Sequence, residues 1–405
     1  MARRILIFTN HYYPENFKIN EISAFLAENG NEVHVVTGTP NYPAGKVYDG
    51  YGLFSKSFEK VNENLSIRRL PLIPRGSGSN LRIVINYISY FISCLIYTLG
   101  LSVFYKKYDV VFVHHTSPIF ITISPIIYKF FKKSRLILWD LDMWPDTLEA
   151  LGIITSKKAL AFLEKIMKVI YSKYDHILLG SNSFKHKATQ RVNPSIISYF
   201  PNWAEDTLTS HQQEQNNNFN FPSGFNIAYT GNIGEAQDFD SIAKAIEITK
   251  DFNVNWIIVG DGRKREWLEK ELSKLNLNGR VIFLGNHSLD QIPEIFEKAD
   301  ALFLALKNEK IFNSTVPAKL QAYMTSGKPI LGMLSGEGNS LILEANCGLV
   351  AESGDFSSFA NNILTLCNSD KRFLDELGLN GKAYYDLNFS LDMRKKQISD
   401  LINLC

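Results

Sequence analysis

The stretch Trp256-Ile257-Ile258-Val259-Gly260-Asp261-Gly262-Arg263 shows the unit from which this sequence is built. Four apolar residues in a row lead into a loop with two glycines, and a helical segment follows. A short apolar run of this kind is typical of a strand buried on both faces, while glycine permits a tight turn from the strand into a helix. The same unit stands just before it, where residues 226–229 lead into a glycine loop at 231–234.

This unit recurs along both halves of the chain. We expect strands at residues 5–8, 33–37, 110–113, 136–139 and 177–179 in the first half, and at 226–229, 256–259, 281–284 and 301–305 in the second. Residues 19–28 have apolar side chains at helical spacing, and Asn29-Gly30 fits a helix end. Apolar strands that alternate with helices predict the α/β class, with doubly wound, Rossmann-like parallel sheets.

The chain is long enough for two domains. Its 405 residues exceed one ordinary core, and the polar run at 211–218 has the composition of a linker. We expect an N-terminal domain at 1–206, a linker at 207–224, a C-terminal domain at 225–385, and a final helix at 386–405 that packs back toward the N-terminal domain. Two such domains are expected to face each other across a cleft, with ligands at the carboxyl ends of the strands.

Composition excludes several classes of protein. With 43 basic and 41 acidic residues the formal charge is only +2, which argues against a nucleic-acid binder and against an acidic disordered protein. The four cysteines form no CxxC pair, so neither a disulfide scaffold nor a structural zinc site is expected. The apolar run at the N-terminus is too short for a signal peptide, which predicts a cytoplasmic location.

Residues 83–105 contain no charged side chain and are long enough to span a bilayer. A single crossing would separate the strands at 33–37 and 110–113, which we expect in one sheet. Two interpretations remain. The helix is buried in the domain with a close contact along Asn86, Ser89, Ser93 and Gly100, or it lies in the membrane interface beside basic residues; we favour the second. A basic amphipathic segment at 157–174, with an apolar stripe, gives weaker support: Leu160, Leu163, Met167, Ile170 and Tyr174.

Glycine loops in the second half predict a phosphate-binding site. Glycine lets a phosphate approach the backbone, and a helix N-terminus offers free N–H groups. Each loop alone is also a common strand-to-helix turn, but four at one sheet edge favour a pocket for a nucleotide diphosphate. No GxxxxGK[ST] signature of a P-loop hydrolase occurs. The candidate residues of this nucleotide site are Gly231, Asn232, Gly234, Gly262, Arg263, Lys319, Glu337, Gly338 and Asn339.

The first half supplies two carboxylates at a strand end. Asp142, with Asp140 as the second candidate, is suited to position or deprotonate a hydroxyl, and the neighbouring Trp144 is suited to stack on a sugar. The alternative is that one of these aspartates caps the next helix. His114, His115 and Asn16 are expected on the same acceptor side, and no metal site is expected because a spaced third ligand is missing.

Several motifs resemble those of a known family. Tyr12-Tyr13-Pro14, Pro201-Asn202-Trp203, Val259-Gly260-Asp261-Gly262 and the segment 323–330 resemble the retaining glycosyltransferases of family 4, which have the GT-B fold. The loops at 140–145, 231–237 and 315–323 are similar to those of the fucosamine-type transferases of bacterial O-antigen and capsule assembly. The resemblance implies a UDP-sugar donor with no other cofactor, retention at the anomeric carbon, and an undecaprenyl-diphosphate-linked acceptor at the inner leaflet of the bacterial membrane.

The sequence also departs from that family. Ser314 and Ala322 stand where the family commonly has two glutamates, and Asn232 and Gln237 stand where it has an arginine and a lysine for the diphosphate. Asn16-Phe17 replaces the expected glycine pair. We therefore expect Lys319 and Arg263 to supply the positive charge, and Glu337 or Glu344 to bind the ribose. A UDP-sugar epimerase of GT-B fold and a non-catalytic partner in polysaccharide assembly are the competing hypotheses.

Overall fold

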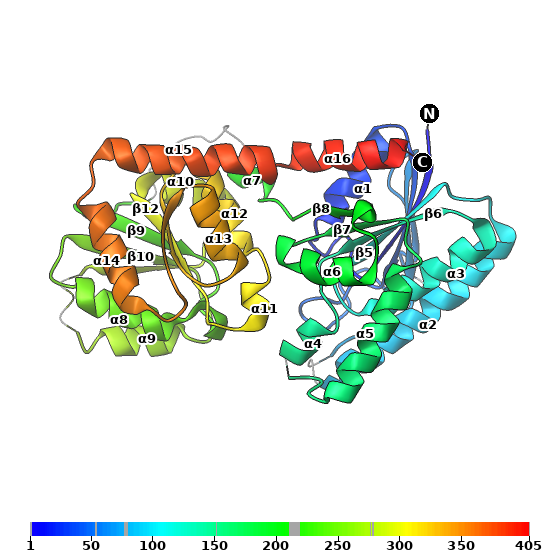
Figure 1. Ribbon diagram of the computed structural model, residues 1–405, viewed down its shortest axis with the longest axis horizontal. Coiled ribbons are helices and arrows are strands. Elements are labelled where there is room, and N and C mark those ends of the chain that lie inside the picture. The colour runs from blue at the N-terminus through cyan, green and yellow to red at the C-terminus, as the bar shows by residue number, and fades with distance from the viewer. Residues whose placement is uncertain are drawn as a thin grey trace. The chain divides into compact units, whose positions relative to one another are not determined.

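The fold was obtained as a computed structural model, which describes residues 2–52, 55–76, 80–150, 152–209, 219–275, 277 and 279–404 (Figure 1). The chain forms two compact units, Met1–Pro201 with Arg394–Cys405, and Asn202–Met393. The polar run at 211–218 lies outside the described residues. Each unit has its own sheet and its own hydrophobic core.

The first unit is built on an eight-stranded sheet in the order β3-β4-β2-β1-β5-β6-β7-β8. Neighbouring strands run parallel except β3 and β4. The strand order reverses between β1 and β5, and in such sheets ligands bind beyond the carboxyl ends of the strands at this point. The strands are β1 Arg4–Thr9, β2 Glu32–Gly38, β3 Phe58–Lys60, β4 Leu65–Leu70, β5 Val110–His115, β6 Arg135–Asp140, β7 His176–Leu179 and β8 Ile197–Tyr199.

Helices cover both faces of this sheet (Figure 1). Their buried apolar side chains and those of β1, β5 and β6 make one core, because strands covered on both faces must be apolar throughout. The helices of this unit are α1 Ile19–Glu28, α2 Asn80–Phe104, α3 Ile123–Lys132, α4 Asp146–Ala150, α5 Lys157–Tyr171, α6 Lys185–Arg191 and α16 Leu391–Asn403.

Helix α2 forms where the uncharged segment was expected. Within the described chain one helix, Leu81–Phe104, is long and apolar enough by length and composition to cross a membrane, with a mean hydropathy of 1.7. It connects β4 to β5, which belong to one sheet, so a single crossing would divide that sheet. Only 22% of the most apolar 18-residue stretch of this helix is buried. The interpretation of a helix enclosed in the domain is therefore wrong.

The two faces of α2 differ. Tyr90, Cys94 and Leu101 are buried in the core, and the Asn86 side chain donates a 2.7 Å hydrogen bond to the carbonyl of Ile73. A Cβ on Gly100 would meet no atom within 4 Å, so the close packing contact expected there is absent. The opposite face exposes apolar side chains along its length: Leu81, Val84, Ile88, Ile92, Ile96, Leu99, Val103 and Phe104.

The apolar stripe expected on the basic segment 157–174 belongs to the core. Met167 and Ile170 on α5 are buried with Tyr174, and Leu163 packs against the same cluster. This corrects the interpretation of that stripe as a lipid-binding face, because side chains that fill the domain interior are not available to lipid.

The second unit has a six-stranded, fully parallel sheet in the order β11-β10-β9-β12-β13-β14. Its strand order reverses between β9 and β12. The strands are β9 Phe225–Thr230, β10 Val254–Val259, β11 Val281–Gly285, β12 Ala301–Ala305, β13 Ile330–Met333 and β14 Gly348–Ala351. Two Rossmann-like α/β units confirm the fold class, and every strand expected from the sequence is present.

Helices again lie on both sides of the second sheet (Figure 1). Trp256, Phe303 and Phe359 form the centre of its core, with their rings in contact. The helices are α7 Asp206–Thr209, α8 Phe239–Thr249, α9 Arg265–Leu272, α10 Ile292–Lys298, α11 Lys310–Asn313, α12 Ala318–Thr325, α13 Glu337–Glu344, α14 Phe356–Cys367 and α15 Lys371–Asn388.

The chain returns to the first unit near its C-terminus. From Arg394 onward α16 belongs to that unit, where Ile398 and Ile402 are buried. The guanidinium of Arg394 lies 5.5 Å from the centre of the Phe200 ring, and the Gln397 amide donates a 2.9 Å hydrogen bond to the carbonyl of Tyr199.

Candidate active site

A buried network organises the carboxyl edge of the first sheet. Asp140, the last residue of β6, has no exposed surface. One of its carboxylate oxygens lies 2.7 Å from Nδ1 of His115 and accepts a 3.2 Å hydrogen bond from the backbone N–H of Asp142, while the other accepts a hydrogen bond from the Tyr171 hydroxyl. The carboxylate therefore fixes the start of the loop that carries Asp142.

Arg191 completes this network from helix α6. Its guanidinium lies 4.7 Å from the Tyr171 ring centre, donates to the carbonyl of Trp144 at 2.5 Å, and makes a two-fold ion pair with Glu164 at 2.7 and 2.8 Å. The Arg191 pair holds the pKa of the Glu164 carboxyl below its usual value, although burial opposes this. The 140–144 loop is thus held from both ends.

Asp142 is placed differently from Asp140. Its side chain is only partly buried, and its Oδ2 accepts hydrogen bonds from the Ser117 hydroxyl and, at 3.2 Å, from the Trp144 indole N–H. The carbonyl of Ser117 in turn accepts a hydrogen bond from the Asn10 amide, which follows β1. The loops after β1, β5 and β6 are therefore joined around Asp142, whose other oxygen has no hydrogen-bond partner among the described residues.

The structure changes the roles that were expected for four residues. Asp140 and His115 are fully buried and cannot touch a substrate as placed, so both support the site from below. His114 is also buried, with Nδ1 2.9 Å from the Thr9 hydroxyl, and burial lowers its pKa to about 3, which keeps it neutral. Trp144 is buried and orients Asp142 instead of offering an open stacking face.

Asn16 is the remaining residue expected on this side. It is exposed in the loop between β1 and α1, next to Phe17, whose ring stacks on His11 at 4.8 Å. Its side chain is therefore accessible, as a substrate contact requires.

A further cluster on this edge did not stand out in the sequence. Arg75, which follows β4, lies with its guanidinium 5.1 Å from the ring centre of Tyr42 and 5.2 Å from that of Tyr87. It donates a 3.1 Å hydrogen bond to Nε2 of His11. These residues lie in four separate segments, so no local motif could have pointed to the cluster.

In the second unit, the glycine loops after β9 and β10 pack backbone against backbone. The N–H of Ile233 donates a 2.8 Å hydrogen bond to the carbonyl of Asp261. A Cβ on Gly260 would lie 2.0 Å from the carbonyl oxygen of Gly231, and one on Gly262 would lie 2.3 Å from that of Ile233. Both positions also have positive φ. Glycine is therefore required at each of them, both for the close contact of the two loops and for the backbone conformation.

Lys319, in the first turn of α12, lies across the first of these loops. A Cβ on Gly231 would meet its Cε at 2.7 Å. Its ammonium lies 3.8 Å from the centre of the Tyr229 ring and also hydrogen bonds to the Tyr229 hydroxyl. No carboxylate of the described residues pairs with it, and burial lowers its pKa from 10.5 to about 7.

Helices α12 and α13 bring the other expected loops to the same edge. Gly336 has a φ of +74°, and a Cβ there would lie 2.1 Å from the carbonyl oxygen of Asn313. A Cβ on Gly338 would come within 3.2 Å of the Pro317 ring. The side chain of Asn339 donates a 3.0 Å hydrogen bond to the carbonyl of Leu334, which fixes the first turn of α13.

The two glutamates proposed for the ribose are separated by the length of α13. Glu337 is buried in the first turn, at the carboxyl edge of the sheet. Glu344 is the last residue of the helix and accepts a 3.0 Å hydrogen bond from the Tyr384 hydroxyl. The structure thus favours Glu337 over Glu344.

Asn232 and Gln237, which stand where a cation pair was expected, are neutral and bonded to each other. The Asn232 amide donates to Oε1 of Gln237 at 3.4 Å, and the N–H of Gly234 donates to the same oxygen at 3.1 Å. Arg263 is exposed at the start of the segment that leads into α9. Asn232 and Gly234 are therefore ordered by Gln237, and Lys319 and Arg263 are the two expected cations near this edge.

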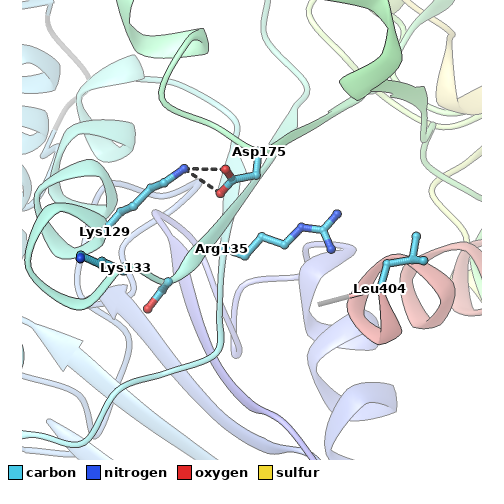
Figure 2. A pocket seen from close by; sticks show the side chains of 6 residues that line it. Lys129, Lys133, Arg135, Asp175 and Leu404 are labelled. Carbon is cyan, nitrogen blue, oxygen red and sulfur yellow. Dashed lines mark hydrogen bonds and ion pairs between the residues drawn. The ribbon is translucent and has the colours of Figure 1, made fainter.

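A cavity of about 460 Å³ lies at the opposite edge of the first sheet. Figure 2 shows Lys129 paired with Asp175 beside Lys133, Arg135 and Leu404. Arg135 begins β6 and Asp175 precedes β7, so this cavity is at the amino ends of the strands, away from Asp142. Among the residues that the structure describes, no three His, Cys, Asp or Glu side chains group so as to hold a metal ion.

Comparisons with known proteins show what this chain is similar to. Residues 224–369 match the family model described as Glycosyl transferases group 1. The chain is 24% identical over 342 residues to the putative colanic acid biosynthesis glycosyl transferase WcaI of Escherichia coli (strain K12), a match that covers 80% of this chain and 81% of WcaI.

Solved structures share the fold of the whole chain. Sucrose-phosphate synthase from Thermosynechococcus elongatus has a TM-score of 0.73 at 13% identity and covers 100% of this chain and 99% of its own. Anabaena HepE, solved with UDP, has a TM-score of 0.68 at 13% identity over 99% and 100% of the two chains. The fold is GT-B, and the comparisons together support a glycosyltransferase.

Proposed function

We propose that the protein transfers a sugar from a UDP-sugar to a lipid-linked sugar acceptor in the assembly of a bacterial surface polysaccharide. The observation that carries the proposal is the partly buried ammonium of Lys319 beside the Gly231 loop, within the segment that matches the glycosyl transferase model; no carboxylate of the described residues pairs with it. A desolvated charge without an opposite charge is unfavourable, and an anionic ligand at this loop would relieve it.

The donor half of the reaction needs positive charge where the diphosphate departs. During transfer the bond between the sugar's anomeric carbon and the diphosphate oxygen breaks, and negative charge grows on that oxygen. Lys319 and the free backbone N–H groups of the first turn of α13, at Gly338 and Asn339, are the groups suited to stabilise it. Glu337, in the same turn, is suited to accept hydrogen bonds from the ribose hydroxyls.

The acceptor half needs a group that orients a hydroxyl and takes its proton. The new bond forms between the acceptor oxygen and the anomeric carbon, and the hydroxyl proton is released. Asp142 suits this part, because Ser117 and Trp144 hold one carboxylate oxygen and leave the other accessible. The resemblance to retaining family 4 enzymes supports attack on the face from which the diphosphate leaves.

A lipid-linked acceptor would lie at a membrane surface, and α2 offers a face for it. Its exposed apolar side chains run along the whole helix, with Lys106 and Lys107 just beyond its end. An apolar helix face with basic residues at its border is typical of proteins that lie on anionic lipid. We propose that the protein is peripheral on the inner face of the cytoplasmic membrane, with α2 in the interface.

The donor sugar and the acceptor lipid follow from resemblance. The loops at 140–145 and 231–237 are similar to those of fucosamine-type transferases, and WcaI is named for colanic acid biosynthesis. We propose UDP-N-acetyl-fucosamine as the first donor to test, with an undecaprenyl-diphosphate-linked sugar as the acceptor class.

The test is a turnover assay with purified protein, a panel of UDP-sugars and a short-chain lipid-diphosphate-N-acetylglucosamine acceptor, read by mass spectrometry. The expected result is a mass gain of one sugar on the acceptor with one donor of the panel, with retained configuration by NMR. Isomerisation of a donor without acceptor would replace the proposal with an epimerase. UDP binding without any turnover would replace it with a non-catalytic partner.

A further inference from the structure

The Arg75 cluster contains a cation whose hydrogen-bond partners are all neutral. Arginine only donates, so Nε2 of His11, 3.1 Å away, must be an acceptor, and the proton of this histidine is on Nδ1. The other contacts are the Asn86 amide oxygen at 3.5 Å and the Tyr87 hydroxyl at 3.4 Å. No described carboxylate forms an ion pair with Arg75.

The carboxylate that contacts His11 is already occupied. Glu15 is buried, and its Oε2 accepts the Nδ1 proton of His11 at 2.8 Å. Its Oε1 accepts hydrogen bonds from the backbone N–H groups of Asn41 and Tyr42, at 2.7 and 2.6 Å. Three donors satisfy Glu15, and the imidazole of His11 separates it from the guanidinium, so the charge of Arg75 is not cancelled by direct contact.

The Arg75 guanidinium is held in one place by its neighbours, and some of its N–H groups can still donate to a ligand. Two tyrosine rings flank it, and Tyr42 is 40% exposed, so the cluster is open to solvent on that side. The hydrogen bonds to His11, Asn86 and Tyr87 use Nε and Nη2, and Nη1 has no hydrogen-bond partner among the described residues, so its N–H groups can serve a ligand. A fixed guanidinium with paired donors matches the geometry of a phosphate oxygen pair.

The cluster lies close to Asp142. Burial raises the pKa of the Tyr87 phenol; the Arg75 guanidinium acts to lower this pKa, and the Asp142 carboxylate acts to raise it. Tyr87 is therefore close enough to both charged groups to interact with each. His11 follows β1 and Asp142 follows β6, with β5 between them. At a strand spacing of about 4.8 Å, the ends of β1 and β6 are about 10 Å apart, so Asp142 and His11, which contacts Arg75, lie on the same edge of the sheet.

The same cluster borders the exposed face of α2. Asn86 and Tyr87 are α2 residues, and Val84 and Ile88 beside them are exposed on that helix. A phosphate at Arg75 therefore places any attached hydrocarbon chain next to an open apolar surface in the same unit. The anion site and the apolar face together fit a molecule that has a phosphate head and a lipid tail.

We propose that Arg75, braced by His11 and Tyr87, binds the phosphate group of a lipid-linked acceptor and selects acceptors that carry it. The inference rests on the proposed function, since it assigns the phosphate subsite of that acceptor. Arg75 is the binding residue, and Glu15 and His11 are positioning residues that hold it.

The first experiment measures binding and needs no turnover. The probe is a short-chain prenyl diphosphate at a concentration below micelle formation, titrated against wild type and Arg75→Met; the matching prenyl alcohol, inorganic diphosphate and vesicles with anionic lipid are run in parallel. We expect the variant to bind the prenyl diphosphate about 10- to 100-fold more weakly, the range for a charge-assisted hydrogen bond. Binding of the alcohol should not change.

The second experiment compares two acceptors with the same sugar and chain, one with a diphosphate and one without. Arg75→Met should raise KM for the diphosphate acceptor by the same factor and leave KM for the phosphate-free acceptor and for the donor unchanged. Arg75→Lys should recover part of the loss. Lys60→Ala, which removes an exposed charge from β3 in the same unit, is the matched control and should change neither constant.

The outcomes separate the two proposals. Equal loss for both acceptors, or equal binding of the prenyl diphosphate by wild type and Arg75→Met, would show that Arg75 only braces the loop and would overturn the inference while transfer itself remains. Arg75-dependent binding of prenyl diphosphate without sugar transfer would leave the phosphate site standing and reject the proposed function. If Arg75→Met weakened the binding of inorganic diphosphate or of anionic vesicles as much as that of the prenyl diphosphate, the site would be assigned to free phosphate or to headgroups, and the selection of acceptors would be overturned.

Discussion

The ammonium of Lys319 lies 3.8 Å from the centre of the Tyr229 ring, and the hydroxyl of the same tyrosine is its hydrogen-bond partner. The aromatic ring attracts the cation but does not neutralise it, so the charge is held at the edge of the sheet without an opposite charge. The arrangement keeps a cation in place for a negative ligand and destabilises the free protein.

Lys319→Met should therefore separate binding from stability. The methionine keeps the apolar part of the side chain and removes the buried charge, so we expect the free energy of unfolding to rise by about 1–3 kcal/mol. UDP-sugar affinity should fall about 10- to 100-fold because a charge-assisted contact is lost. Calorimetric titration with UDP and urea unfolding measure the two effects, and unchanged UDP affinity would remove Lys319 from the donor site.

Donor binding should also take up a proton above neutral pH. The pKa of Lys319 is lowered to about 7 by burial, and a bound diphosphate would raise it again. Below pH 7 the ammonium is already charged and no proton is needed; as pH rises past 7 the free lysine becomes neutral and affinity falls. Titrations at pH 8 in buffers of different ionisation enthalpy should show uptake of about one proton per UDP, and Lys319→Met should show none.

Asp142→Asn should reduce kcat and leave donor affinity intact. Asparagine still accepts the hydrogen bonds of Ser117 and Trp144 but cannot take a proton, so we expect a loss of about 10²- to 10⁴-fold in kcat. Asp146→Asn is the control, because this exposed aspartate of α4 pairs only with Lys187 among the described residues. A kcat within threefold of wild type would exclude Asp142 as the base.

Asp140→Ala should act on stability. It leaves His115, Tyr171 and the Asp142 N–H without their buried acceptor, and we expect a loss of about 2–4 kcal/mol in the free energy of unfolding. Asp146→Ala, whose ion pair is at the surface, should cost less than about 1 kcal/mol. Denaturant midpoints provide the comparison, and equal midpoints would show that the buried network contributes nothing.

Ile96→Glu and Val103→Glu on α2 should weaken membrane binding without unfolding the protein. Their side chains are 66% and 71% exposed, so each change is expected to cost little stability but to reduce binding to anionic vesicles about 10-fold or more. Leu387→Glu is the control, an equally exposed leucine of the second unit. Co-sedimentation with vesicles measures the membrane binding of each variant. Unchanged binding of the α2 variants would show that this face does not contact lipid.

The sequence predicts the fold well where strands are buried on both faces. Runs such as 5–8 and 256–259 are apolar throughout, so they are recognisable without any neighbour. Strands β3 and β8 have three residues each, and β4 carries Arg68 and Arg69, so none of them has a continuous apolar run. Strands β13 and β14 were not expected either, because a glycine interrupts or begins each of them.

The candidate site could be predicted only where the residues of a single loop indicate a function by themselves. The glycines at 231, 260 and 262 mark close backbone contacts, and Lys319 stands beside a helix start, so both could be found locally. Burial decides which aspartate is accessible, and neighbouring positions in sequence do not show that Asp140 lies inside while Asp142 reaches the surface. The Arg75 cluster depends on four distant segments that come together only when the sheet forms.

The return of α16 to the first unit also orders the events of synthesis. Domains generally fold as units while the chain emerges from the ribosome, with the N-terminal one first. Here Phe200 and Tyr199 contact Arg394 and Gln397, which are translated only after most of the second unit. These contacts of the first unit therefore form late. The unit that is made first is therefore completed last, and a chain that stops short of residue 394 leaves the first unit without the contacts of Arg394 and Gln397.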